Sequence, residues 1–265
     1  MNTRIIISLI VYALWIVVTL LGAKILLGGA EVPLDEMVKN GIGWQFVAAI
    51  VLLVAFILAR KWNDLAFGPP HSVLKVMWFP VAWLLLIFSV TLLTGLPPAS
   101  MIVFIAFNTL LVGISEETMF RGVLFRAFVT QYRIWTAIIV SSVLFGAVHI
   151  LNVFNTGDLN GALMQSVPAA MSGILFVAIV IRTESIWPAI IYHWLWDCVL
   201  FILLTGSQAS GVDANPAALE GLGSAKDFLP IAMGLPNFIC GLILLRKVRD
   251  ESFREAEARR MSEAA

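Results

Sequence analysis

The feature that most constrains this chain is a series of long apolar stretches, separated by short breaks that are polar or rich in glycine and proline. A helix needs about 20 mainly apolar residues to cross the hydrocarbon layer of a membrane. Hydrophobic residues make up 60% of the sequence and charged residues 13%, a balance that is not typical of soluble domains. We therefore predict an all-α, polytopic integral membrane protein with about eight transmembrane helices. The predicted spans are 5–27, 42–59, 73–94, 99–131, 134–151, 163–181, 185–206 and 228–245, of which the fourth is too long and too polar for a simple span.

The distribution of Lys and Arg predicts the orientation, because cytoplasmic loops retain positive charge. With the amino terminus in the cytoplasm, only Lys24, Lys39 and Lys226 of the 17 Lys and Arg residues fall outside. The cytoplasmic segments then hold the other 14: Arg4, Arg60, Lys61, Lys75, Arg121, Arg126, Arg133, Arg182, Arg246, Lys247, Arg249, Arg254, Arg259 and Arg260. We expect both termini in the cytoplasm, and a prokaryotic cytoplasmic membrane as the location.

The chain shows no sign of a separate soluble domain or of an internal repeat. We predict a single transmembrane domain over residues 1–245, followed by a charged cytoplasmic tail, 246–265, that is either a solvated helix or disordered. The formal net charge is zero, so nothing indicates nucleic acid as a partner, and the lipid bilayer is the expected environment. The sequence does not determine the oligomeric state.

Three groups of ionisable residues lie inside the predicted spans. Each charge at membrane depth costs roughly 2.5–3.5 kcal/mol on insertion scales, so such residues usually serve a function. The groups are Glu116-Glu117-x-x-x-Arg121 in the fourth span, Phe145-x-x-x-His149 in the fifth, and His193-x-x-x-Asp197 in the seventh.

Helical spacing sorts these residues into pairs. Glu117 and Arg121 are i,i+4 neighbours and can form an ion pair, whereas Glu116 is rotated by about 100° and stays free. His193 and Asp197 are also i,i+4 neighbours, which places an imidazole beside a carboxyl group on one helix face.

Depth along the helices brings the groups together. If the fourth and fifth spans form a hairpin near residue 132, Glu116 and His149 both lie about 25 Å from the turn, and are level with each other. His193 reaches the same depth if the hairpin projects about 10 Å into the cytoplasm. We therefore predict one site in the cytoplasmic half of the membrane, opening to the cytoplasmic side. Three nearby glycines would let neighbouring helices approach closely: Gly113, Gly122 and Gly146.

Such a site can hydrolyse an amide bond in two ways. A carboxylate beside an imidazole can hold and deprotonate a water molecule, while a second imidazole donates hydrogen bonds to the oxyanion that develops on the attacked carbonyl. Alternatively, two histidines and the carboxylates could bind a divalent cation such as zinc, which activates a bound water. The residues fit both versions. In the second, Glu116, His149, His193 and Asp197 would be the ligands.

The three motifs, in this order on successive apolar helices, resemble those of the CPBP family, the CAAX-prenyl-protease and bacteriocin-processing intramembrane endopeptidases, also called the Abi family. The resemblance covers roughly residues 100–205. It implies that Glu116 and His149 activate the water and that His193 and Asp197 stabilise the oxyanion. Glu117, Arg121 and Phe145 would support the site. Some relatives carry asparagine at the last position, and its N–H can donate a hydrogen bond, whereas an ionised Asp197 can only accept one. Asp197 must therefore be protonated, orient His193 or bind a metal.

The function expected from the resemblance is an intramembrane endopeptidase, a hydrolase that cuts a peptide bond in a membrane-associated substrate. A prenylated protein tail, a leader peptide and a membrane-protein fragment all fit as substrates. Two alternatives stay open. One is a proton-coupled transporter that uses the four polar residues as a proton relay. The other is a non-catalytic scaffold or immunity protein of the same fold.

Overall fold

The computed structural model describes residues 2–209 and 228–263, and these residues form helices and no strand. The all-α prediction is thus confirmed. Residues 210–227, which contain Lys226 and most of the predicted loop before the last span, lie outside the described residues. The helices are α1 (Thr3–Leu26), α2 (Leu34–Lys39), α3 (Trp44–Arg60), α4 (Val73–Thr94), α5 (Ala99–Glu117), η1 (Thr118–Leu124), α6 (Phe125–Val129), α7 (Ile134–Ile150), α8 (Val153–Thr156), α9 (Leu159–Thr183), α10 (Trp187–Ala209), α12 (Leu229–Leu245) and α13 (Asp250–Glu263).

Several of these helices are long and apolar enough to cross a membrane. Among the described residues six qualify by length and composition, and α12 makes a seventh if it is counted with the start of α13, from which it is bent by 83°. The remaining predicted span, 42–59, forms α3, an apolar helix of 17 residues. The protein is therefore an integral membrane protein with six to seven candidate spans, and the count of eight stays a prediction.

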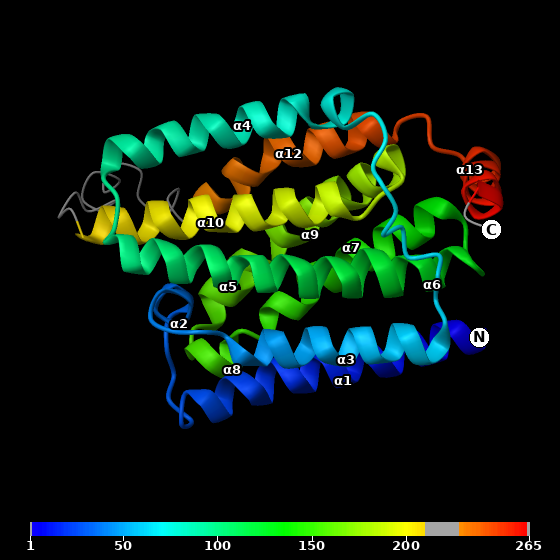
Figure 1. The fold of residues 1–265 in the computed structure, drawn as a ribbon. Helices are drawn as coiled ribbons and strands as arrows, with labels where there is room; N and C mark the ends of the chain where they lie inside the picture. The colour runs from blue at the N-terminus through cyan, green and yellow to red at the C-terminus, as the bar shows by residue number, and fades with distance from the viewer. Residues whose placement is uncertain (1, 210–227, 264–265) are drawn as a thin grey trace.

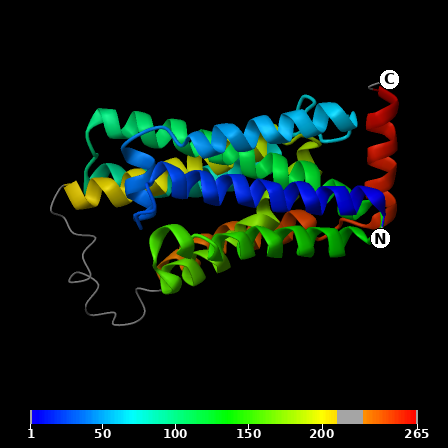
Figure 2. The same cartoon turned by 90° about the horizontal axis from the view of Figure 1, so that it is seen from below.

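The long helices run side by side as a bundle, with both termini at one end and the short helices α2 and α8 at the other (Figure 1). The main packing pairs are α7 with α9, α9 with α12, α5 with α10, and α1 with α3. The helix α13 crosses the end at which the termini lie (Figure 2). It is anchored there, because the Asp250 carboxylate accepts a hydrogen bond of 2.6 Å from the backbone N–H of Ile134.

The fourth predicted span differs from a continuous α-helix. It begins as α5, turns into the seven-residue π-helix η1 immediately after Glu117, and ends as α6. A π-helix bonds each N–H to the carbonyl five residues before it, which widens the turn and shifts the register of the side chains that follow. Such segments occur frequently at functional sites. Uniform α-helical spacing could not predict this change of register.

Two of the three expected close approaches occur. A methyl group on Gly113 would lie 3.2 Å from the Ile190 carbonyl oxygen, so this glycine lets α5 lie against the backbone of α10. A methyl group on Gly146 would lie 2.6 Å from the Ser166 carbonyl oxygen, so the approach of α7 to α9 is even closer. The prediction is wrong for Gly122, where the nearest side-chain atom would be 3.7 Å away, an ordinary contact.

Candidate active site

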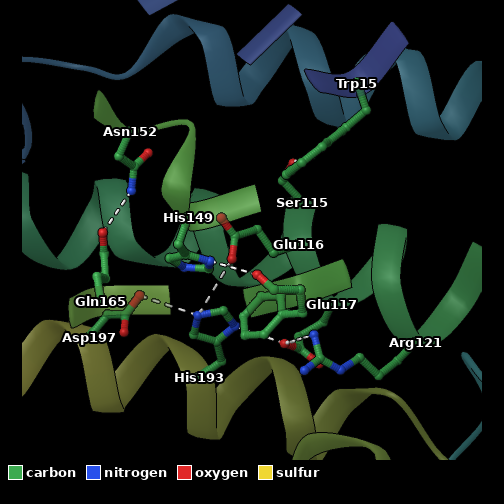
Figure 3. A network of polar contacts seen from close by, with 11 residues as sticks. Trp15, Ser115, Glu116, Glu117, Arg121, His149, Asn152, Gln165, His193 and Asp197 are labelled. Carbon is green, nitrogen blue, oxygen red and sulfur yellow. Dashed lines mark hydrogen bonds and ion pairs between the residues drawn. The ribbon is translucent and has the colours of Figure 1, made fainter. Parts of the chain in front are cut away.

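The three motifs meet at mid-depth in the bundle. Glu116 and Glu117 come from the last turn of α5, His149 from the last turn of α7, and His193 and Asp197 from the middle of α10. Figure 3 shows these side chains turned toward one another, with Arg121 behind Glu117. Side chains from three helices are thus close together in the structure, as the helix lengths predict.

Glu117 connects two of the motifs. Its Oε1 atom lies 3.0 Å from Nη1 of Arg121 and 2.8 Å from Nδ1 of His193. All three side chains are buried, with Glu117 at 0% and Arg121 at 1% exposure. The ion pair expected from the i,i+4 spacing is confirmed. The bridge from Glu117 to His193 was not expected, since the spacing within one helix says nothing about a residue 76 positions away.

His193 faces carboxyl groups on both sides of its ring. Its Nε2 atom lies 3.3 Å from Oδ2 of Asp197 and 3.9 Å from Oε2 of Glu116, while Nδ1 contacts Glu117. Carboxylate oxygens only accept hydrogen bonds, so each short contact needs one proton, either on the nitrogen or on the oxygen. The ring is therefore held in one orientation, with Nε2 directed toward Glu116 and Asp197.

Two phenylalanines frame this network. The Phe176 ring stacks on His193 with centroids 4.8 Å apart and planes 20° apart, and the Phe145 ring meets His193 edge-on at 5.7 Å. The Arg121 guanidinium lies 4.2 Å from the Phe145 centroid and 4.9 Å from that of Phe176, so the rings also hold the cation. Phe145 was predicted to support the site. Phe176 was missed, because a phenylalanine in an apolar helix gives no signal in the sequence.

His149 is fixed by its own helix. Its Nδ1 atom lies 2.7 Å from the carbonyl oxygen of Phe145. A carbonyl only accepts, so Nδ1 carries the proton of the neutral ring and Nε2 is left with a lone pair. His149 can therefore accept a hydrogen bond from a water molecule.

A cavity of about 130 Å³ lies against Glu116, His149 and Asp197. Because one water occupies about 30 Å³ in the liquid, this volume holds a few water molecules. The Oε2 atom of Glu116 is buried without a hydrogen-bond partner, whereas the neighbouring hydroxyl of Ser115 accepts a 2.8 Å hydrogen bond from Nε1 of Trp15. Trp15 was not predicted to lie at the site. A carboxyl oxygen, an imidazole lone pair and space for water thus coincide.

The cavity extends from the site toward the end of the bundle where α2 and α8 lie (Figure 1), because Leu34 and Met37 of α2 and Asn155 of α8 belong to its wall. The termini lie at the other end. In the described residues this cavity therefore extends away from the end at which the termini lie, and both expectations about the cytoplasmic side stay predictions.

The residues do not form a metal site as they stand. Among residues 2–209 and 228–263, no group of three His, Cys, Asp or Glu side chains has an arrangement that could hold a metal ion. Nδ1 of His193 is taken by Glu117 and Nδ1 of His149 by Phe145, which leaves Nε2 of each ring as a possible ligand. In the described residues, however, the four predicted ligands lie close together without converging on one point.

Residues 98–199, less than half of the chain, match a family model described as Rce1-like, type II CAAX prenyl endopeptidase. The match includes every predicted site residue from Glu116 to Asp197. No curated protein and no solved structure shows significant similarity to the chain.

Proposed function

We propose that this chain, whose residues 98–199 match the Rce1-like model of type II CAAX prenyl endopeptidases, cleaves a peptide bond inside the membrane with a water molecule activated by Glu116. The observation that carries the proposal is that three of the predicted site residues line one cavity. Glu116 presents a buried oxygen without a hydrogen-bond partner to the same small space as His149 and Asp197. A general base must reach the proton that it removes, and a water in this cavity lies within such reach.

In the first step, Glu116 takes a proton from the water while the water oxygen attacks the carbonyl carbon of the scissile peptide bond. The lone pair on Nε2 of His149 accepts the other water proton in a hydrogen bond and orients the nucleophile. The carbonyl π electrons move to the oxygen, which becomes an oxyanion. In the second step, the oxyanion collapses, the C–N bond breaks, and the leaving nitrogen takes the proton from Glu116.

His193 and Asp197 stabilise the oxyanion in this proposal. Nε2 of His193 lies 3.3 Å from Oδ2 of Asp197, which lines the cavity, and an N–H at this nitrogen can be donated to the substrate oxygen. Glu117 and Phe176 keep the ring in that orientation from behind. Because Glu117, Arg121 and Phe176 are buried away from the reacting atoms, they are positioning residues.

We propose that the reaction uses no bound metal, because the donor set does not converge. Elemental analysis of the purified protein, with cleavage measured before and after chelation, tests this part. We expect substoichiometric metal and unchanged cleavage. One tightly bound metal ion per chain, with cleavage lost on its removal, would contradict it.

The substrate is proposed to be a membrane-associated polypeptide. A comparison of the peptide termini in cells with and without the active protein tests this directly. Peptide termini collected from cells that express the wild-type chain should include a set that is missing from cells that express Glu116→Gln. If the two sets are identical, the chain cleaves nothing in those cells, and the proposed function fails.

A further inference from the structure

The cavity follows α1 from the site to one end of the bundle. Trp15, Thr19 and Ala23 belong to its wall and are spaced four residues apart, so they line one face of α1 from its middle to its last turns. At the far end the wall is formed by Met37 of α2 and Asn155 of α8. The cavity thus runs along the helix axis, away from the end where the termini lie.

The opposite direction is closed. Between the site and the termini end, η1 contributes Met119, Phe120, Val123 and Leu124, each with 0% exposure. Arg121 fills the remaining space between the rings of Phe145 and Phe176. A peptide cannot pass this layer without unpacking the core, and within the described residues the cavity leads from the site past α2 and α8.

The far part of the wall is suited to a peptide backbone. The buried side-chain oxygens of Gln45 and Asn155, with exposures of 7% and 5%, have no hydrogen-bond partner and line the cavity. A buried acceptor without a partner costs about 1–3 kcal/mol, which a backbone N–H of a bound peptide would recover. Asn152 donates a 2.8 Å hydrogen bond to Gln165, and both of these side chains also line the cavity.

The charges at the two ends of the bundle differ. At the termini end, Arg60 and Arg182 lie in the last turns of α3 and α9, and Lys75 lies at the start of α4. At the mouth end, the described cations are Lys24 and Lys39, and Lys39 is neutralised by contacts of 3.3 Å with Asp35 and 2.7 Å with Glu36. The excess of Lys and Arg marks the termini end as cytoplasmic. The mouth of the cavity then faces the outside.

We propose that the substrate enters this cavity from the extracytoplasmic side, and that it is an exported or membrane-anchored polypeptide whose extended outer segment is cut. This inference rests on the proposed function and specifies its substrate class. A prenylated tail that is presented in the cytoplasm would meet the closed end of the bundle. A chain segment that emerges on the outer surface would meet Gln45 and Asn155 first and Glu116 last.

Single cysteines test the side of access. In a chain whose two cysteines, Cys198 and Cys240, are replaced by alanine, Met37→Cys lies at the mouth. Asn40→Cys is exposed at the same end but outside the cavity wall, and Lys75→Cys is exposed at the termini end. Each full-length variant is treated with a membrane-impermeant maleimide, in intact cells and in inside-out vesicles. Cleavage is then compared before and after modification of the same variant.

We expect Met37→Cys and Asn40→Cys to react in intact cells, and Lys75→Cys only in inside-out vesicles. Modification at position 37 should abolish cleavage, whereas modification at position 40 should not. Reaction of Met37→Cys only from the cytoplasmic side would overturn the proposal, as would full cleavage after complete modification of position 37. These outcomes are distinct from failure of the proposed function, in which Glu116→Gln still cleaves and the labelling pattern is unaffected.

Discussion

Glu117 and His193 are joined by a contact of 2.8 Å between Oε1 and Nδ1, at a point where neither side chain reaches solvent. The same oxygen pairs with Arg121 at 3.0 Å. One carboxylate therefore serves both as the counter-ion of a buried cation and as the group that orients a proposed oxyanion donor. Stability and chemistry are coupled through this residue.

We predict that Glu117→Ala destabilises the protein strongly, by about 3–5 kcal/mol, because it leaves the buried Arg121 cation without its partner. Cleavage should fall as well, since His193 loses its contact at Nδ1. The unfolding transition in detergent measures the first effect. In the double variant Glu117→Ala/Arg121→Leu, part of the stability should return but cleavage should not, because no buried charge is left and His193 is still unsupported. A double variant as unstable as Glu117→Ala would contradict this explanation.

We predict different outcomes for two replacements of Asp197. Asparagine keeps an oxygen that can accept from Nε2 of His193 and adds an N–H that can donate to the oxyanion, so Asp197→Asn should keep most of the cleavage rate. Alanine has neither an oxygen that accepts nor an N–H that donates, so Asp197→Ala should lower the cleavage rate about 10²-fold. The cleavage rates of the two purified variants, compared at equal melting temperatures, test this prediction. If Asp197→Asn is as slow as Asp197→Ala, a negative charge is required at this position.

We predict that Gly146→Ala lowers the melting temperature, because its methyl group would lie 2.6 Å from both the Ala170 Cβ atom and the Ser166 carbonyl oxygen. Forcing α7 and α9 apart should cost about 1–3 kcal/mol. Gly122→Ala is the matched control, since its nearest side-chain contact would be 3.7 Å away. Equal stability of the two variants would show that the α7–α9 contact is less tight than described.

The sequence predicted the three motifs, their common depth and the Glu117–Arg121 pair, because these follow from helix length and i,i+4 spacing. It could not predict which way the site opens. That direction depends on side chains from α1, α2 and α8 that have no distinctive pattern, such as Thr19, Met37 and Asn155. The π-helix after Glu117 and the stacking of Phe176 on His193 were also missed, since neither has a distinctive pattern in the sequence.

Acidic pH should weaken the junction between α1 and the loop after α3. Burial by itself raises the pKa of Asp64, but the hydrogen bond and the charge of Arg4, with Nη1 2.8 Å from Oδ2, hold that pKa below its usual 3.8. Because the pKa of Asp64 is lower in the folded state than in the unfolded state, its ionised form stabilises the fold at pH values above the unfolded-state pKa. This stabilisation is lost as the pH falls through the folded-state pKa. We predict that Asp64→Asn lowers stability at pH 7 by about 1 kcal/mol or less, and that the difference disappears in acid. A difference that persists below pH ~3 would contradict this.

The most direct test of the whole account is the cleavage rate of purified Glu116→Gln, measured on a substrate identified from the missing peptide termini. Glutamine has the same shape as glutamate but cannot take a proton from water at neutral pH, so the melting temperature should be unchanged. We predict that the rate falls by about 10²-fold or more. A Glu116→Gln variant that cleaves at the wild-type rate would contradict the assignment of Glu116 as the base.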